Sequence, residues 1–126
     1  YYISLIPNGY YTQKIENISI VKNETRNISY TLDCTDKATV EGYLTINDQL
    51  VYSGSASVKN PEKDKFGKYN FCTYKLRNEK FYTLKGIPPG KYRLSAGGVI
   101  KDNIIKDREI SIELKAGETK IFNFDL

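Results

Sequence analysis

The most reactive side chains in this sequence belong to two cysteines, Cys34 and Cys72. They lie far apart along the chain, without the CxxC spacing that metal sites and redox enzymes use. We therefore expect a structural disulfide between them, which would close a long loop and stabilise the fold by about 3–4 kcal/mol. The alternative is a pair of buried free thiols in a cytosolic protein.

Three Asn-x-Ser/Thr sequons, the acceptor motif for N-linked glycans, begin at Asn17, Asn23 and Asn27. Composition alone would give roughly one or two such motifs, so their placement matters more than their number. If Ile20 and Ile28 point into a core, strand alternation directs the asparagines of these segments to solvent. We expect a glycan on at least one of them; the alternative is a plain polar strand face.

The remaining polar residues give no indication of catalysis. Histidine is absent from the sequence, which removes the commonest general base and zinc ligand and leaves every serine without a triad partner. The carboxylates lack EF-hand or paired-carboxylate spacing. We therefore expect no enzyme activity, no metal and no cofactor. One covalent reaction stays open, a Lys–Asn or Lys–Asp isopeptide bond such as Gram-positive pilins form, but the sequence does not identify the pair.

Composition favours one globular domain. The chain has 126 residues and a net charge of +4, with acids and bases interspersed and no basic stripe for nucleic acid. No apolar run approaches the roughly 18 residues of a membrane-spanning helix. The sequence lacks methionine, even at position 1, so we expect that a secretory leader has been removed or that the chain is an excerpt of a longer one.

The apolar residues alternate with polar ones along most of the chain, which is the pattern of half-buried strands. Turn residues recur at the spacing of a sandwich or barrel, notably at 47–48, 60–65, 86–90 and 101–103, and residues 116–118 suggest a closing hairpin. We predict an all-β sandwich whose inward faces include Val40, Leu44 and Ile46; Leu50, Tyr52, Ala56 and Val58; Ile110, Ile112 and Leu114; and Phe122, Phe124 and Leu126.

The N-terminus is a short apolar strand with Tyr1, Ile3 and Leu5 on one face, followed by Pro7-Asn8-Gly9 as a hinge. We divide the chain into an arm and hinge at 1–9 and a sandwich domain at 10–126. The arm is either an ordinary first strand of its own domain or an extended donor strand that completes the sheet of a neighbour.

Two segments resemble known sandwich families. Residues 81–94 (FYTLKGIPPGKYRL) and the tail at 112–126 are similar to the strand–turn–strand and closing hairpin of transthyretin-like and carboxypeptidase-regulatory-like domains. The hydrolases with this fold need His, so their activity is not implied. In its overall organisation the chain resembles subunits of archaeal thread-type pili, which implies an Ig-like sandwich, dense glycosylation and assembly through donor strands.

The arm and this resemblance together predict a structural subunit of an extracellular filament on the cell surface, with a role in adhesion. Its partners would be identical subunits, joined head to tail, and N-linked glycans. The alternative is a secreted carbohydrate- or protein-binding module of a larger surface protein. That module would use exposed tyrosines such as Tyr10, Tyr11, Tyr43, Tyr69 and Tyr74.

Overall fold

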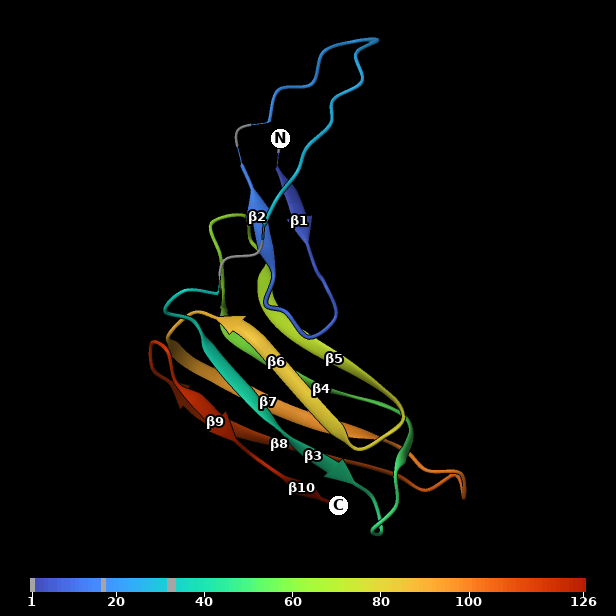
Figure 1. The fold of residues 1–126 in the computed structure, drawn as a ribbon. Helices are drawn as coiled ribbons and strands as arrows, with labels where there is room; N and C mark the ends of the chain where they lie inside the picture. Colours follow the sequence, from blue (N-terminus) through green and yellow to red (C-terminus); the bar gives the residue numbers. More distant parts are fainter. Residues whose placement is uncertain (1, 17, 32–33) are drawn as a thin grey trace.

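The computed structural model describes residues 2–16, 18–31 and 34–126, and every regular element in these ranges is a β-strand. Figure 1 shows two facing layers of strands with a small hairpin projecting from one end. The strands are β1 (Ile3–Leu5), β2 (Gln13–Ile15), β3 (Ala38–Thr45), β4 (Val51–Lys63), β5 (Tyr69–Glu79), β6 (Phe81–Ile87), β7 (Gly90–Val99), β8 (Ile105–Leu114), β9 (Thr119–Ile121) and β10 (Phe124–Asp125).

The two layers are four-stranded sheets, and the prediction of an all-β sandwich is confirmed. The β3 sheet has the order β10–β3–β6, with β9 pairing on β3 as well. The β4 sheet has the order β5–β4–β7–β8 and is antiparallel throughout. Strands β9 and β10 run parallel to β3. The hairpin is the separate two-stranded sheet β1–β2.

The core lies between the two sheets and follows the predicted alternation along most strands. Val40, Leu44 and Ile46 are fully buried, as predicted. Leu84, Tyr92 and Leu94 also enter this core, from β6 and β7. Of the last strands, Leu114 and Phe124 are buried, while Ile110, Ile112, Phe122 and Leu126 are partly buried against the core.

At the start of β4, the prediction of which side chains point into the core is wrong. Leu50 and Tyr52 are half exposed, and Val51 between them is fully buried. A Cβ added to Gly54 or Gly98 would lie only 2.9 or 2.8 Å from Cγ1 of Val51. Val51 therefore fills the space that two missing side chains leave, which directs it inward in place of its neighbours.

The predicted closing hairpin is also wrong. The turn at 116–118 forms, with the Glu118 amide donating to the Lys115 carbonyl at 3.1 Å. However, β8 before it belongs to the β4 sheet and β9 after it pairs with β3. The turns at 47–48 and 88–89 likewise connect strands of different sheets. Turn residues reverse the chain, but they do not decide which sheet edge receives the next strand.

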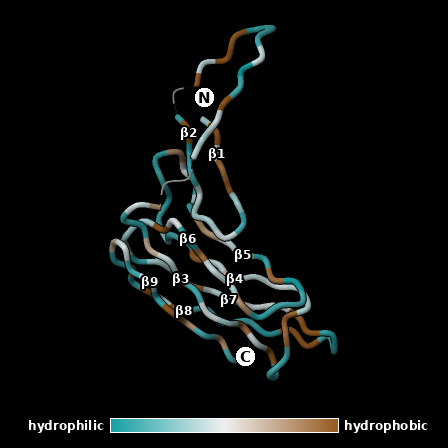
Figure 2. Tube along the Cα trace, in the orientation of Figure 1, coloured by the Kyte–Doolittle hydropathy of each residue, from teal (hydrophilic) through white to brown (hydrophobic). Residues whose placement is uncertain are grey.

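The predicted strands around the sequons are absent as well. Residues 18–31 form a long loop, in which Ile20, Ile28 and Tyr30 are 67%, 42% and 46% exposed. The isoleucines line a small hollow of about 180 Å³ together with Ile3, beside the hairpin. Figure 2 shows hydrophobic stretches along this loop. These isoleucines therefore pack within the projection and are absent from the buried core between the two sheets.

The C-terminal strands are attached through two tyrosines on neighbouring strands. The buried Tyr82 hydroxyl donates to the Phe122 carbonyl at 2.6 Å, and the Tyr43 hydroxyl donates to the Asp125 carboxylate at 3.1 Å near the surface. Burial raises the pKa of Tyr82 well above its usual range, so this hydroxyl remains a donor. The more buried bond meets less competition from water, so it should contribute more to the stability of the fold.

The substitution Tyr82→Phe is expected to lower the free energy of unfolding by about 1–2 kcal/mol, because it leaves a carbonyl at the sandwich edge without its donor. The matched change Tyr43→Phe should cost less than about 0.5 kcal/mol, since water replaces the exposed bond. Urea unfolding of both variants measures the difference. Equal losses would mean that Tyr82 does not attach the C-terminal strands.

Candidate functional site

One side of the sandwich is closed by a short extended stretch, residues 8–12, which we call the bridging segment. The Gly9 amide donates to the Thr73 carbonyl of β5, and the Lys85 amide of β6 donates to the Gly9 carbonyl, both at 2.7 Å. Three residues later, the Thr12 amide donates to the Phe71 carbonyl of β5 at 2.9 Å. The segment therefore pairs with the edge strands of both sheets at once.

The bridging segment is anchored by Tyr11, which is 5% exposed and lies in the core. Its ring packs edge-on against Tyr92, with ring centroids 5.9 Å apart, and the Tyr92 hydroxyl donates to the Pro88 carbonyl at 2.6 Å. Burial raises the pKa of both phenols. Tyr11 is thus a core residue and does not fit the predicted role of an exposed ligand-binding tyrosine. Of the other tyrosines named for that role, Tyr69 is exposed, while Tyr10, Tyr43 and Tyr74 are partly buried.

The N-terminal arm is residues 1–6, and its described part, residues 2–6, turns away from the sandwich before the bridging segment. After β1 the chain reverses in a turn, in which the Tyr10 amide donates to the Pro7 carbonyl at 3.1 Å. Strand β1 pairs with β2 of the same chain, with Ile3 opposite Ile15 and Leu5 opposite Gln13. Ile3 is nevertheless 38% exposed. Tyr1, which was predicted to share the face of Ile3 and Leu5, lies outside the described residues.

The edge of β6 stays unpaired beyond the bridging segment. Lys85 directs its amide and carbonyl toward that segment, so Thr83 and Phe81, two and four residues earlier, direct theirs to the same side. Within the described ranges, no strand pairs with β6 on this side before residue 85. The Thr83 carbonyl lies against Gly9, 2.8 Å from the position that a Cβ there would take, and the backbone groups of Phe81 are left without a strand partner on this side among the described residues.

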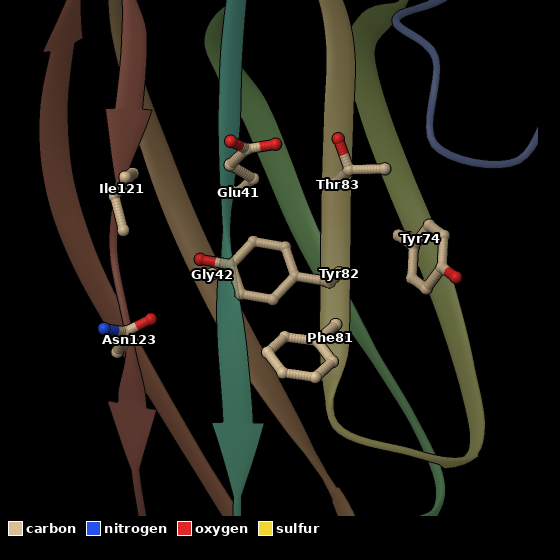
Figure 3. A pocket seen from close by; sticks show the side chains of 8 residues that line it. All are labelled: Glu41, Gly42, Tyr74, Phe81, Tyr82, Thr83, Ile121 and Asn123. Atoms are coloured by element: carbon tan, nitrogen blue, oxygen red, sulfur yellow. The ribbon is translucent and has the colours of Figure 1, made fainter.

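A hollow of about 430 Å³ borders this free edge. Figure 3 shows its lining from β3, β5, β6, β9 and the stretch after β9: Glu41, Gly42, Tyr74, Phe81, Tyr82, Thr83, Ile121 and Asn123. Phe81 and Ile121 are 64% and 68% exposed. The Thr83 hydroxyl oxygen is buried without a hydrogen-bond partner in the described part of the chain. An apolar hollow beside an unpaired strand edge suits an extended peptide with alternating apolar side chains.

A polar cluster lies at the other end of the bridging segment. Oδ2 of Asp64 contacts Nζ of Lys14 and accepts a hydrogen bond from Nδ2 of Asn70 at 3.2 Å. Oδ1 accepts from the backbone amides of Phe66 and Lys68 at 2.9 and 3.1 Å. The lysine ammonium and the two amides lower the pKa of Asp64 to about 2. No pattern along the chain indicates this pair, because its members are 50 residues apart.

The predicted disulfide is wrong. Both cysteines are free thiols, with Cys34 exposed and Cys72 buried. Cys72 points into the core from β5, where its Sγ lies 3.9 Å from the Lys85 carbonyl oxygen. Sγ of Cys34 lies 3.6 Å from the position that a Cβ on Gly86 would take. Each sulfur thus lies against the backbone of β6, and the core packs around Cys72 without a cross-link.

The predicted glycosylation residues lie on the projection. Asn23 and Asn27 are exposed in the loop at 18–31, where a glycan would meet no packed strand. Asn17 lies outside the described residues. The solvent exposure expected for the sequons is present at both described asparagines, although it arises from a loop and not from the polar face of a strand. Glycosylation itself stays a prediction.

No family model, no curated protein and no solved structure matches this chain significantly. The resemblance to transthyretin-like domains and thread-type pili therefore stays a prediction. In the described ranges, no three His, Cys, Asp or Glu side chains gather closely enough to hold a metal ion. A search of the same residues for a helix suited by length and apolarity to cross a membrane finds none.

We expect one cysteine to react with a thiol reagent in the native protein and two in the unfolded protein. Cys34 is exposed, whereas burial raises the pKa of Cys72 to about 12 and keeps it as a protonated, inaccessible thiol. Quantitative labelling before and after denaturation measures this, with Cys34→Ala as the control that abolishes native labelling. If neither state labels without a reductant, the cysteines are oxidised.

Proposed function

We propose that this chain is a structural subunit of an extracellular, cell-surface filament, and that it polymerises by inserting its N-terminal strand into the neighbouring subunit. The observation that carries this proposal is a single slot between β5 and β6. The chain's own bridging segment fills one part of the slot, and no strand of the described residues pairs with β6 beside Phe81 and Thr83. An apolar arm lies directly before the bridging segment in the chain.

The arm is held only weakly in its own subunit. Strand β1 has three residues and pairs on one side with β2. Tyr2 stacks on Phe66 with centroids 4.2 Å apart, but Ile3 and Ile6 are 38% and 55% exposed. Each hydrogen bond of this short ladder contributes about 0.5–1.5 kcal/mol. Releasing the arm therefore costs little compared with burying its apolar side chains elsewhere.

The slot is already shaped for an extended strand. The bridging segment runs parallel to β6, with Tyr10 opposite Lys85, and it bonds to β5 as well. A strand that continued the same line toward Thr83 and Phe81 would meet the free edge of β6. The turn at Pro7 prevents the chain's own arm from taking this path. The arm of a second copy would span about 20 Å in extended form, enough to follow this edge.

Insertion would also bury apolar surface on both partners. The alternating side chains Ile3 and Leu5 would face the hollow that contains Phe81 and Ile121. Each large aliphatic side chain contributes about 1.5–3 kcal/mol when it is fully buried. Since donor and acceptor are different surfaces of the same subunit, the contact is heterologous and repeats head to tail into a fibre. Glycans on Asn23 and Asn27 would cover the projection between subunits.

A second candidate function rests on the same hollow. Phe81 offers an exposed aromatic face in the same hollow as the Glu41 carboxylate and the Asn123 amide. An apolar surface with a few convergent polar groups also suits a small ligand such as a carbohydrate. In that case the chain would be a binding module of a larger surface protein, and the arm would remain in its hairpin.

Donor and acceptor variants separate the two functions. The arm variant Ile3→Asp/Leu5→Asp and the acceptor variant Phe81→Asp should each lose polymerisation, because a charge cannot enter the apolar slot. A mixture of the two should form dimers and nothing longer, since only the intact arm of one fits the intact slot of the other. Light scattering on size-exclusion fractions and electron microscopy measure these sizes.

The matched control is Ile105→Asp, which changes an isoleucine that is 77% exposed on β8, outside the arm and the slot. It should polymerise like the unmodified chain. If the arm variant still forms filaments, donor-strand assembly is wrong. If the unmodified chain stays monomeric at high concentration while Phe81→Asp loses binding to a carbohydrate array, the binding-module function is favoured.

A further inference from the structure

The contact between Lys14 and Asp64 connects the projecting hairpin with the turn between β4 and β5, which also meet through the Tyr2–Phe66 stack and the Lys65–Glu16 ion pair. Lys14 lies in β2, the inner strand of the projecting hairpin, and Asp64 begins the turn between β4 and β5. Oδ2 of Asp64 and Nζ of Lys14 are in direct contact. The Lys14 and Asp64 side chains are only 13% and 16% exposed, respectively. In the nearby ion pair, the side chains of Lys65 and Glu16 are 67% and 39% exposed.

Two aromatic rings shield this contact from water. Tyr2 and Phe66 stack on each other, and Nζ of Lys14 lies 5.6 Å from the centre of the first ring and 4.8 Å from that of the second. A shielded amine and carboxyl group in contact react with effective concentrations that reach about 10⁵–10⁸ M in well-oriented pairs. Exclusion of water also disfavours hydrolysis of any amide that forms there.

The two oxygens of Asp64 have different surroundings. Oδ1 accepts hydrogen bonds from two backbone amides, those of Phe66 and Lys68. Such a pair of amides stabilises negative charge on the oxygen of a tetrahedral intermediate, as in an oxyanion hole. Oδ2 faces the lysine nitrogen and the Asn70 amide. One oxygen is therefore positioned to stay as a carbonyl and the other to leave.

We propose that Lys14 and Asp64 condense into an intramolecular isopeptide bond. The ion pair is the ground state, and the reaction starts from its less populated neutral form, in which a proton has passed from the Lys14 ammonium to Oδ2 to give an amine and a carboxylic acid. Nζ then attacks Cγ, and the bond from Cγ to Oδ2 breaks. Oδ2 departs as water with that proton and a second one from Nζ. The ammonium and carboxylate become one secondary amide and one water molecule, with no oxidant or other reactant.

The bond would lock β2 to the sandwich and leave β1 free. Lys14 follows the bridging segment in the chain, so the cross-link would also keep that segment between β5 and β6 when the arm is pulled. It forms within one chain and does not require assembly. The bond can therefore be present in a chain that never polymerises, or absent from one that does.

Intact-mass spectrometry of the full chain, produced in a host without N-glycosylation and denatured before measurement, tests the proposal. The expected mass is that of the sequence less one water molecule, and a protease digest should yield a branched peptide that joins residues 14 and 64. The variants Lys14→Arg and Asp64→Ala should both have their full sequence masses. Lys14→Arg keeps the positive charge, so it remains informative if Asp64→Ala does not fold.

The matched control Lys65→Arg, at the exposed ion pair with Glu16, should retain the loss of water. A full sequence mass for the folded, unmodified chain would overturn the proposal. So would the recovery of residues 14 and 64 in separate linear peptides. Loss of ammonia in place of water would assign the acceptor to Asn70 and overturn the role of Asp64.

Discussion

The bridging segment is the constraint on which the arrangement of this molecule depends. Its backbone donates to β5 and both donates to and accepts from β6, so a single stretch of five residues joins the edges of two sheets. Because Tyr11 is buried between them, the segment cannot slide without removing an aromatic ring from the core. Its position determines where the arm leaves the sandwich and where Lys14 enters the cluster with Asp64.

Two edges of the sandwich, β8 and the free part of β6, differ in the side chains that they present. Strand β8, an edge of the β4 sheet, carries a run of exposed charged side chains, Lys106, Asp107, Arg108 and Glu109. Such charges discourage the addition of a foreign strand. The free part of β6 presents Phe81 and Thr83 beside an apolar hollow. A molecule that needed no partner would be expected to protect this edge as it protects β8.

The proposed assembly and the proposed cross-link place different demands on the hairpin. Assembly requires that β1 separates from β2, which a three-residue ladder allows. The proposed filament would also require that the rest of the N-terminal region stays attached when the arm is pulled, although segments held mainly by exposed backbone hydrogen bonds open locally. An amide between Lys14 and Asp64 would satisfy the second demand without hindering the first, since it acts on β2 and leaves β1 unaltered.

The sequence by itself determined the fold class and much of the core, because alternation states directly which side of a strand each residue faces. Val40, Leu44 and Phe124 are buried as this pattern predicts. Tertiary structure decided the rest. Every strand edge offers the same backbone groups, so turn residues could not reveal that 116–118 joins different sheets. The alternation at Ile20 and Ile28 required a facing sheet that the fold does not supply there. Whether Cys72 meets Cys34, or Lys14 meets Asp64, depends on distances that chain packing alone sets.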